Sequence, residues 1–147
     1  MKNISPLMLP LILNKLKKRL DQTSLSSLKE YNLSKLHLLY LMVLFENEEG
    51  MTLKELSEHL GFDKANTSRA ISQLTDKGFV RKLSQGELAM KYKVELTPKG
   101  RDVAMIIWGQ IDEANVEIVS LFTPEELQSL AQIAGKLWTY LQETESE

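Results

Sequence analysis

The sequence predicts a mainly α-helical fold that contains one small β-hairpin. Hydrophobic residues recur at intervals of three and four along most of the chain, which is the spacing of one face of an α-helix. Capping residues and glycine stops divide these stretches into separate helices. Only residues 79–96 change to an alternating pattern, with Gly86 in the middle. Together these observations indicate a helical protein whose single hairpin lies between two groups of helices.

The composition excludes several classes of site. Among 147 residues, 43% are hydrophobic and 26% are charged, as in an ordinary globular protein. The absence of cysteine excludes disulfides, thiolate metal sites and a cysteine redox sensor. Two histidines are too few for a histidine-based metal cage. We therefore expect no metal site, no cofactor and no catalytic residues.

The N-terminal segment is not expected to enter a membrane. Its longest apolar stretch, Leu7 to Leu13, is interrupted by Pro10 and is too short to span a bilayer. No small-residue cleavage site follows it. The chain is accordingly expected to be cytoplasmic.

Two helices are predicted in the first third of the chain. Ser5 and Pro6 form an N-cap followed by a proline suited to the first helical turn, and leucines continue at helical spacing to about residue 22. Residues 23–27 are mostly small and polar, which predicts a loop or a frayed helix end. Ser34 can cap a second helix over residues 35–46. Because that helix is apolar on nearly every side, it should lie in the middle of the core.

Two shorter helices should follow in the central third. Thr52 and Glu55 have the spacing of a capping box, and Gly61 can end the helix that they begin. Asp63 can cap the next helix, which should run to about Lys77. Its inward side chains are expected to be Thr67, Ala70, Ile71 and Leu74.

The hairpin and two long helices complete the predicted fold. Residues 79–83 and 89–96 are expected to form its strands, with a turn at Gln85 and Gly86. Thr97 and Pro98 should begin a long helix that ends near residue 121. Thr123 and Glu126 form a second capping box for a last helix with a full hydrophobic stripe. A helix, a glycine-containing turn, a second helix and a hairpin make up a winged helix-turn-helix.

The terminal helices carry more apolar surface than the small central unit can cover. A second copy of the chain would bury it and would place two DNA-facing helices about one duplex turn apart. An intramolecular bundle remains the alternative. We expect one intertwined domain in three parts: an N-terminal dimerisation helix and loop over 1–34, a winged helix-turn-helix over 35–100, and C-terminal dimerisation helices over 101–147.

Charge is distributed unevenly, although the net charge is only −2. Residues 63–101 carry a net +5 and residues 102–147 a net −8. No acidic residue occurs between Lys64 and Thr75, as a surface that approaches phosphates requires. An ordinary exposed helix would carry more glutamate and lysine.

Double-stranded DNA is therefore the expected partner. The second helix of a helix-turn-helix lies in the major groove, where arginine can pair with guanine and asparagine or glutamine with adenine. In the hairpin, cations could contact the DNA backbone. The alternative for each residue is a solvated surface. The candidate DNA-binding residues are Lys64, Ala65, Asn66, Ser68, Arg69, Ser72, Gln73, Arg81, Lys82, Lys91 and Lys93.

Three stretches resemble the MarR family of bacterial and archaeal regulators. They are residues 53–61 (LKELSEHLG), residues 63–80 (DKANTSRAISQLTDKGFV) and residues 94–100 (VELTPKG). The flanking helices fit as well, so the resemblance covers nearly the whole chain. It implies a homodimer that binds a pseudo-palindromic operator, acts as a transcription repressor and is released by a small phenolic or other anionic aromatic ligand.

The hairpin departs from the family pattern at one place. The family's Asp-x-Arg element would fall on Leu88, Ala89 and Met90, so both of its charges are missing. Either Lys91 or Lys93 takes over the minor-groove contact, or the hairpin binds DNA weakly.

The resemblance also implies a ligand site between the dimerisation helices and the DNA-binding part. Its candidate residues are His37, Tyr40, Phe45 and Trp108. Aromatic packing in the core is the stronger alternative for each of them.

Two other classes of function are the alternatives. An enzyme has no support, because no catalytic triad, phosphate loop or metal-ligand spacing is present. A winged helix that serves only as a protein-interaction module is the second alternative, and the acidic C-terminal third favours it. The polar and cationic residues of 64–73 argue against that module.

Overall fold

The computed structural model describes residues 5–23, 25–83 and 92–144. The elements, in chain order, are a 3-10 helix η1 (Pro6–Met8), α1 (Leu9–Thr23), α2 (Leu25–Glu30), α3 (Lys35–Glu46), β1 (Met51–Thr52), α4 (Leu53–Leu60), α5 (Lys64–Asp76), β2 (Val80–Leu83), β3 (Lys93–Leu96), α6 (Pro98–Val119) and α7 (Pro124–Thr144). The predicted mainly helical fold with a small winged helix-turn-helix is confirmed.

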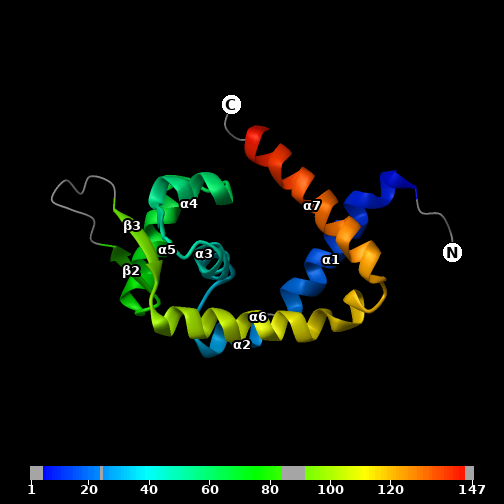
Figure 1. The fold of residues 1–147 in the computed structure, drawn as a ribbon. Helices are drawn as coiled ribbons and strands as arrows, with labels where there is room; N and C mark the ends of the chain where they lie inside the picture. The colour runs from blue at the N-terminus through cyan, green and yellow to red at the C-terminus, as the bar shows by residue number, and fades with distance from the viewer. Residues whose placement is uncertain (1–4, 24, 84–91, 145–147) are drawn as a thin grey trace.

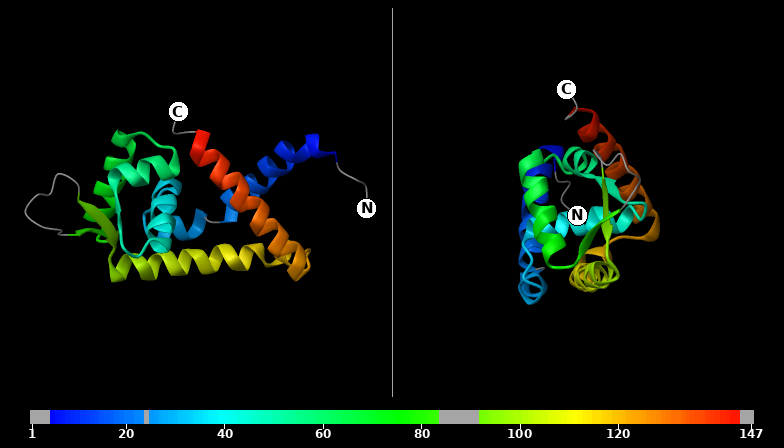
Figure 2. Two further views of the ribbon diagram at one scale, coloured as in Figure 1. Left: turned by 45° about the horizontal axis from the view of Figure 1, so that its top comes forward. Right: turned by 90° about the vertical axis from the view of Figure 1, so that its left-hand side faces the viewer.

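The described elements form a lobe and an arm (Figure 1). The lobe contains α3, α4, α5 and the strands. From it α6 extends as one long helix, and α7 returns from the far end of α6 toward α4. The right-hand view of Figure 2 shows that α1 and α7 lie on opposite sides of α6, while α2 lies at the junction with the lobe.

The hydrophobic core lies in the lobe, and α3 runs through it. Tyr40 and Leu41 of α3 are fully buried, and Leu44 is nearly so. They pack with Leu56 of α4 and Leu74 of α5, among other buried residues. The prediction that the apolar helix over 35–46 occupies the centre is therefore confirmed.

A three-stranded antiparallel sheet forms one wall of the lobe. Its strand order is β1-β3-β2, with Val80 opposite Leu96 and Met51 opposite Val94. The alternation predicted for β3 is confirmed where the structure describes it, since Val94 and Leu96 are buried. The predicted turn at Gln85 and Gly86 lies outside the described residues. Strand β1 was not predicted, because two residues carry no periodicity.

Local helix signals were located correctly. Thr52 accepts from the backbone N–H of Glu55 (3.1 Å), while the Glu55 carboxylate accepts from the backbone N–H of Thr52 (2.7 Å), so the predicted capping box is formed. Gly61 ends α4 with a φ of +66°, a conformation that strains other residues. The predicted loop over residues 23–27 is wrong in part: α2 begins at Leu25, and its Leu28 is buried in the core.

The long helix α6 is joined tightly to the sheet at Gly100. A Cβ atom placed there would lie 1.9 Å from the carbonyl oxygen of Phe79, the residue just before β2. Thr97 caps α6 by accepting from the N–H of Gly100 (3.0 Å), and its hydroxyl donates to the carbonyl of Gly78 (2.6 Å). The arm therefore begins at a fixed point of the lobe.

The tip of α7 returns to the lobe at His59. The Gln142 amide donates to the carbonyl oxygen of His59 (3.0 Å) at the end of α4. The rings of His59 and Trp138 lie 5.0 Å apart. The remainder of α7 has no buried residue in a single chain.

Candidate nucleic-acid interface

Helix α5 is fixed to the core by one face, as predicted. Its N-cap Asp63 accepts from the backbone N–H of Asn66 (2.7 Å). Ala70, Ile71 and Leu74 are buried, and Thr67 is fully buried, as they were expected to be.

A buried hydrogen bond ties this face to α3. The Thr67 hydroxyl lies 2.9 Å from the Tyr40 hydroxyl. Burial of the phenol raises the pKa of Tyr40, and the bond to Thr67 opposes that shift. Thus α5 is held in one rotation about its axis, and its opposite face is turned to solvent.

The opposite face, here called the α5 outer face, contains seven of the predicted DNA-binding residues. Six of them are exposed and Asn66 is half-buried. Its members are Lys64, Ala65, Asn66, Ser68, Arg69, Ser72 and Gln73. Because no carboxylate occurs between positions 64 and 75, this convex face carries only neutral and cationic groups.

Arg69 is oriented by its neighbours on α5. Its guanidinium donates to the Asn66 side-chain oxygen (2.9 Å) and to the carbonyl of Ala65 (3.4 Å). The Asn66 amide in turn donates to the Asp63 carboxylate. A row of hydrogen bonds along one turn therefore holds the cation over the preceding turn of α5.

The side chain of Gln73 lies on the side of α5 that is next to α3, at the edge of the α5 outer face. Its side-chain oxygen lies 2.8 Å from Nε2 of His37, a buried residue of α3. Two residues that the sequence assigned to different sites, His37 to a ligand and Gln73 to DNA, are thus direct partners.

The described cationic residues of the hairpin, or wing, lie on β2 and β3 at its base. The Arg81 guanidinium pairs with the Glu95 carboxylate on the neighbouring strand (2.7 Å). The Lys82 ammonium lies 4.2 Å from the centre of the Tyr92 ring. Lys93, which alternates with the buried Val94 in β3, is half-buried. Lys91 and residues 88–90, where the family's charged element would fall, lie outside the described residues.

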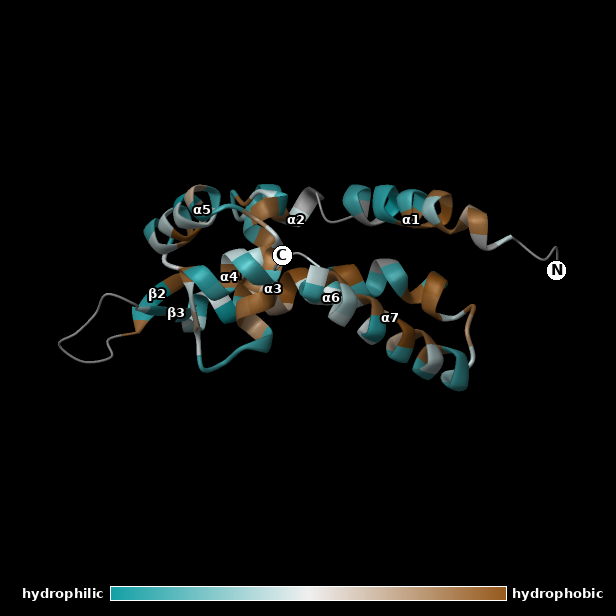
Figure 3. Ribbon diagram, turned by 90° about the horizontal axis from the view of Figure 1, so that it is seen from above, coloured by the Kyte–Doolittle hydropathy of each residue, from teal (hydrophilic) through white to brown (hydrophobic). Residues whose placement is uncertain are grey.

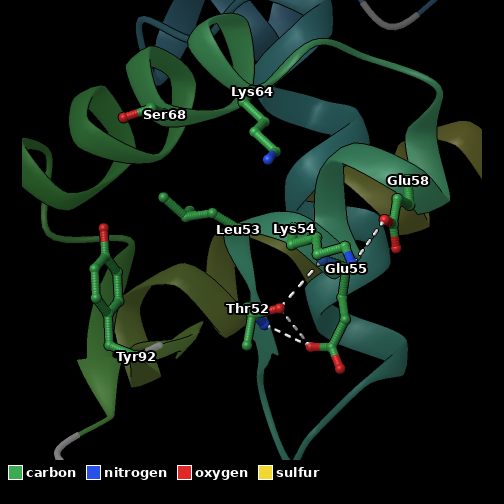
Figure 4. Close-up of a pocket in the computed structure, with 8 residues that line it drawn as sticks. All are labelled: Thr52, Leu53, Lys54, Glu55, Glu58, Lys64, Ser68 and Tyr92. Carbon is green, nitrogen blue, oxygen red and sulfur yellow. Dashed lines mark hydrogen bonds and ion pairs between the residues drawn. The ribbon is translucent and has the colours of Figure 1, made fainter. Parts of the chain in front are cut away.

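A groove separates α5 from the base of the wing (Figure 4). It has a volume of about 560 Å³ and is lined by Thr52, Leu53, Lys54, Glu55, Glu58, Lys64, Ser68 and Tyr92. Lys54 is paired with Glu58 (3.6 Å), and Glu55 is engaged by Thr52. In the described part of the chain, the Lys64, Ser68 and Tyr92 polar groups have no partner, and they lie around Leu53.

Tyr92 was not among the predicted site residues. The alternation of β3 assigned it to the same inward face as Val94 and Leu96. It lies just before β3, however, where that face passes from the core to the groove. Its position next to the end of a strand was the only available signal.

The Glu55 carboxylate in this groove is held ionised. Hydrogen bonds from the backbone and hydroxyl of Thr52 lower the pKa of Glu55, and the nearby charge of Lys93 acts in the same direction. The negative charge of Glu55 therefore stabilises the cap of α4.

The four predicted ligand residues occupy different environments. Tyr40 is fully buried and bonded to Thr67, and His37 is bonded to Ser34 and Gln73. Phe45 is half-buried beneath the guanidinium of Arg101, whose carbon lies 5.2 Å from the ring centre. Trp108 of α6 is 39% exposed. None of the four lines the groove of Figure 4.

Two other kinds of site are absent from the described part of the chain. No group of three or more histidine, aspartate or glutamate side chains there is arranged to hold a metal ion. No helix among those described is long and apolar enough to cross a membrane.

Comparisons with known proteins agree on one group of regulators. Residues 31–87 match the model of the MarR family. The uncharacterized HTH-type transcriptional regulator YybA of Bacillus subtilis is 27% identical over 118 residues, which cover 80% of this chain and 78% of YybA.

Solved structures share the fold along nearly the whole chain. A putative MarR family transcriptional regulator from Listeria monocytogenes, in complex with a 26mer DNA, has a TM-score of 0.79 and 25% identity, covering 99% of this chain and 93% of that one. NadR in complex with 4-hydroxyphenylacetate has a TM-score of 0.76 and 17% identity, covering 94% and 96%. The second likeness concerns the fold alone.

Proposed function

We propose that the chain is a member of the MarR family of transcription regulators and acts as a dimeric, sequence-specific repressor in the cytoplasm. The observation that carries the proposal is the α5 outer face. It is exposed, free of carboxylates and rigidly backed by the core. Such a face can enter a major groove without repelling the phosphates on either side. We propose no enzymatic activity.

In this proposal the α5 outer face and the wing divide the contacts with DNA. Arg69 has the chemistry to pair with guanine O6 and N7, while Ser68 and Ser72 can donate to or accept from base edges. Arg81, Lys82, Lys91 and Lys93 of the wing would contact phosphates, which fix position without selecting sequence. The DNA-bound Listeria relative supports this use of the fold.

A homodimer is proposed because hydrophobic surface is left uncovered on the arm. Figure 3 shows hydrophobic residues along α7 and at the outer ends of α1 and α6. The stripe of α7, here called the α7 stripe, consists of Leu130, Ile133, Leu137, Trp138 and Leu141, each between 46% and 54% exposed. Monomeric proteins rarely expose contiguous apolar surface of this kind.

The arrangement of the chain as a lobe and an arm supports the proposal that one domain contains three parts. Residues 35–100 contain most of the lobe, and the described helices within residues 1–34 and 101–147 form the arm, except that Leu28 of α2 and Ile107 of α6 pack in the lobe core. A twofold axis through the arm would present two α5 outer faces to a pseudo-palindromic operator.

Release by a small anionic aromatic ligand belongs to the proposal as well. Its support is the fold shared with NadR, which was solved in complex with 4-hydroxyphenylacetate. Trp108 of α6, which is 39% exposed, offers a ring surface for such a compound.

Electrophoretic mobility shift and footprinting on the DNA upstream of the protein's own gene test the proposal. We expect a protected palindrome, and an affinity that falls steeply with salt because each neutralised phosphate releases a counterion. A phenolic acid should release the complex. If DNA is not retarded at any salt concentration, the fold serves as a protein-interaction module instead.

A further inference from the structure

We propose that His37 is a positioning residue for DNA recognition: it holds the oxygen of the Gln73 amide, so that Gln73 presents only its NH₂ group to the duplex. This inference rests on the proposed DNA binding and makes it more specific. It assigns a role to a buried histidine that the groove and the wing do not use.

The tautomer of the neutral His37 ring is fixed by the backbone. The N–H of Ser34 can only donate, and it lies 3.1 Å from Nδ1 of His37, so Nδ1 must be an acceptor. In a neutral imidazole, the hydrogen is then on Nε2. The capping box of α3, in which the Ser34 hydroxyl accepts from the N–H of His37 (3.2 Å), keeps the ring in this orientation.

The orientation of the Gln73 amide follows from that tautomer. Nε2–H donates, so the partner 2.8 Å away must be the amide oxygen. Since His37 is only 7% exposed, the oxygen is directed toward the protein interior. The NH₂ group, which has no partner among the described residues, remains for an external acceptor.

A free glutamine pairs with adenine through both ends of its amide. Gln73, in contrast, can only donate outward. Its natural partners are acceptors: a phosphate oxygen, or guanine O6 and N7, or thymine O4. A hollow of about 370 Å³ on this flank of α5 is lined by Asn32, Leu33, Ser34, His37, Gln73 and Lys77. Lys77 supplies the one cationic side chain among these lining residues.

The first experiment measures the tautomer in the free protein. Nitrogen-15 NMR of the imidazole rings distinguishes a proton on Nε2 from one on Nδ1. We expect the Nε2–H form for His37. A proton on Nδ1 would overturn the proposal whether or not the protein binds DNA.

The second experiment is a double-mutant cycle on a footprinted operator. Gln73→Leu removes the donor. His37→Glu keeps a residue favoured in capping boxes, but its carboxylate attracts the NH₂ group and turns the Gln73 oxygen outward. Each single variant should bind about three- to tenfold more weakly, as expected for one hydrogen bond. The double variant should bind DNA no more weakly than the single variant that has the lower affinity, because the two residues act as one unit.

Modified DNA identifies the acceptor. A methylphosphonate at one position of each half-site, or 7-deazaguanine at one base, should weaken the wild type but not Gln73→Leu. The first result assigns a phosphate and the second a base. His59→Glu, which makes the same charge change at the other histidine, is the matched control and should leave this sensitivity unchanged.

Two outcomes would contradict the inference while leaving the proposed function intact. One is a Gln73→Leu variant that binds like the wild type. The other is a cycle in which the two losses simply add, since a histidine with only a structural role would lower affinity independently of Gln73. If the wild type itself binds no DNA, the proposed function fails and the inference fails with it.

Discussion

Arg69 is presented to solvent in a conformation that its own helix already holds. The hydrogen bonds that its guanidinium donates to Asn66 and to the carbonyl of Ala65 restrict its rotamers before any partner arrives. Less side-chain entropy is therefore lost when the guanidinium binds a base, which increases its contribution to affinity.

Replacing this arginine should reduce both affinity and selectivity. We expect Arg69→Ala to cost about 1–3 kcal/mol of binding free energy and to relax the preference at one base pair of each half-site. Selection from randomised operators measures both quantities. Lys136→Ala, which removes a cation from α7, is the control. If Arg69→Ala retains the wild-type preference, Arg69 does not contact a base.

Tyr92 should contribute to binding without contributing to its salt dependence. Tyr92→Phe removes the hydroxyl from the groove and keeps the ring beneath Lys82. We expect about a three- to tenfold loss on all sequences, with an unchanged salt slope, because the lost donor is uncharged. Lys64→Gln, in the same groove, should lower the slope by about one unit. A Tyr92→Phe variant with full affinity would remove the groove from the interface.

At the scale of elements, the helix caps determine where the lobe's helices begin. Thr52 and Glu55 cap α4, Asp63 caps α5 and Thr97 caps α6. Each cap sets the direction of the helix that follows it. The two helices of the helix-turn-helix are consequently oriented by local chemistry before packing completes the lobe.

The capping box of α4 should make stability depend on pH. The pKa of Glu55 is lowered in the folded state, so its contribution is full above the ordinary glutamate pKa, about 4.3, and is lost as pH falls through the lower folded value. Glu55→Gln should lower Tm at pH 7, and the difference should shrink below about pH 4. Thermal unfolding between pH 2.5 and 7 measures it. Glu113→Gln is the control, and a constant difference would contradict the assignment.

These caps also explain what could be predicted from the sequence. The boundaries of α3 to α6 follow from residues within one turn of each end, such as Ser34, Thr52 and Gly61. Strand β1 and helix α2 do not, because Met51 pairs with Val94 across the fold and Leu28 gains its burial from the lobe.

The candidate site divides in the same way. The inward and outward faces of α5 follow from helical periodicity, and the described structure agrees with that division. The partnership of His37 with Gln73 and the groove around Tyr92 bring together residues 36 and about 40 positions apart in sequence. No periodic pattern specifies such contacts, since they depend on how α3, α4 and the wing pack.

At the scale of the whole molecule, the α7 stripe should determine the oligomeric state. Leu137 lies on that stripe and is 53% exposed in one chain, so a charge there has little to disrupt within the monomer. We expect Leu137→Glu to give monomers and to weaken operator binding at least tenfold, because two linked half-sites bind far better than one. Sedimentation velocity measures the mass.

The neighbouring Lys136→Glu, away from the stripe, is the control for charge and should remain dimeric. A dimeric Leu137→Glu variant of wild-type stability would exclude the α7 stripe from the interface.

The contact of α7 with His59 attaches the end of the arm to the lobe. From α4 the chain runs through α5 and the strands, along α6, through the turn that contains Phe122 and back along α7 to α4. An arm that is attached to the lobe at both ends resists bending more than an arm that is attached at one end. The separation between the two α5 outer faces of a dimer would therefore depend on the angle between α6 and α7.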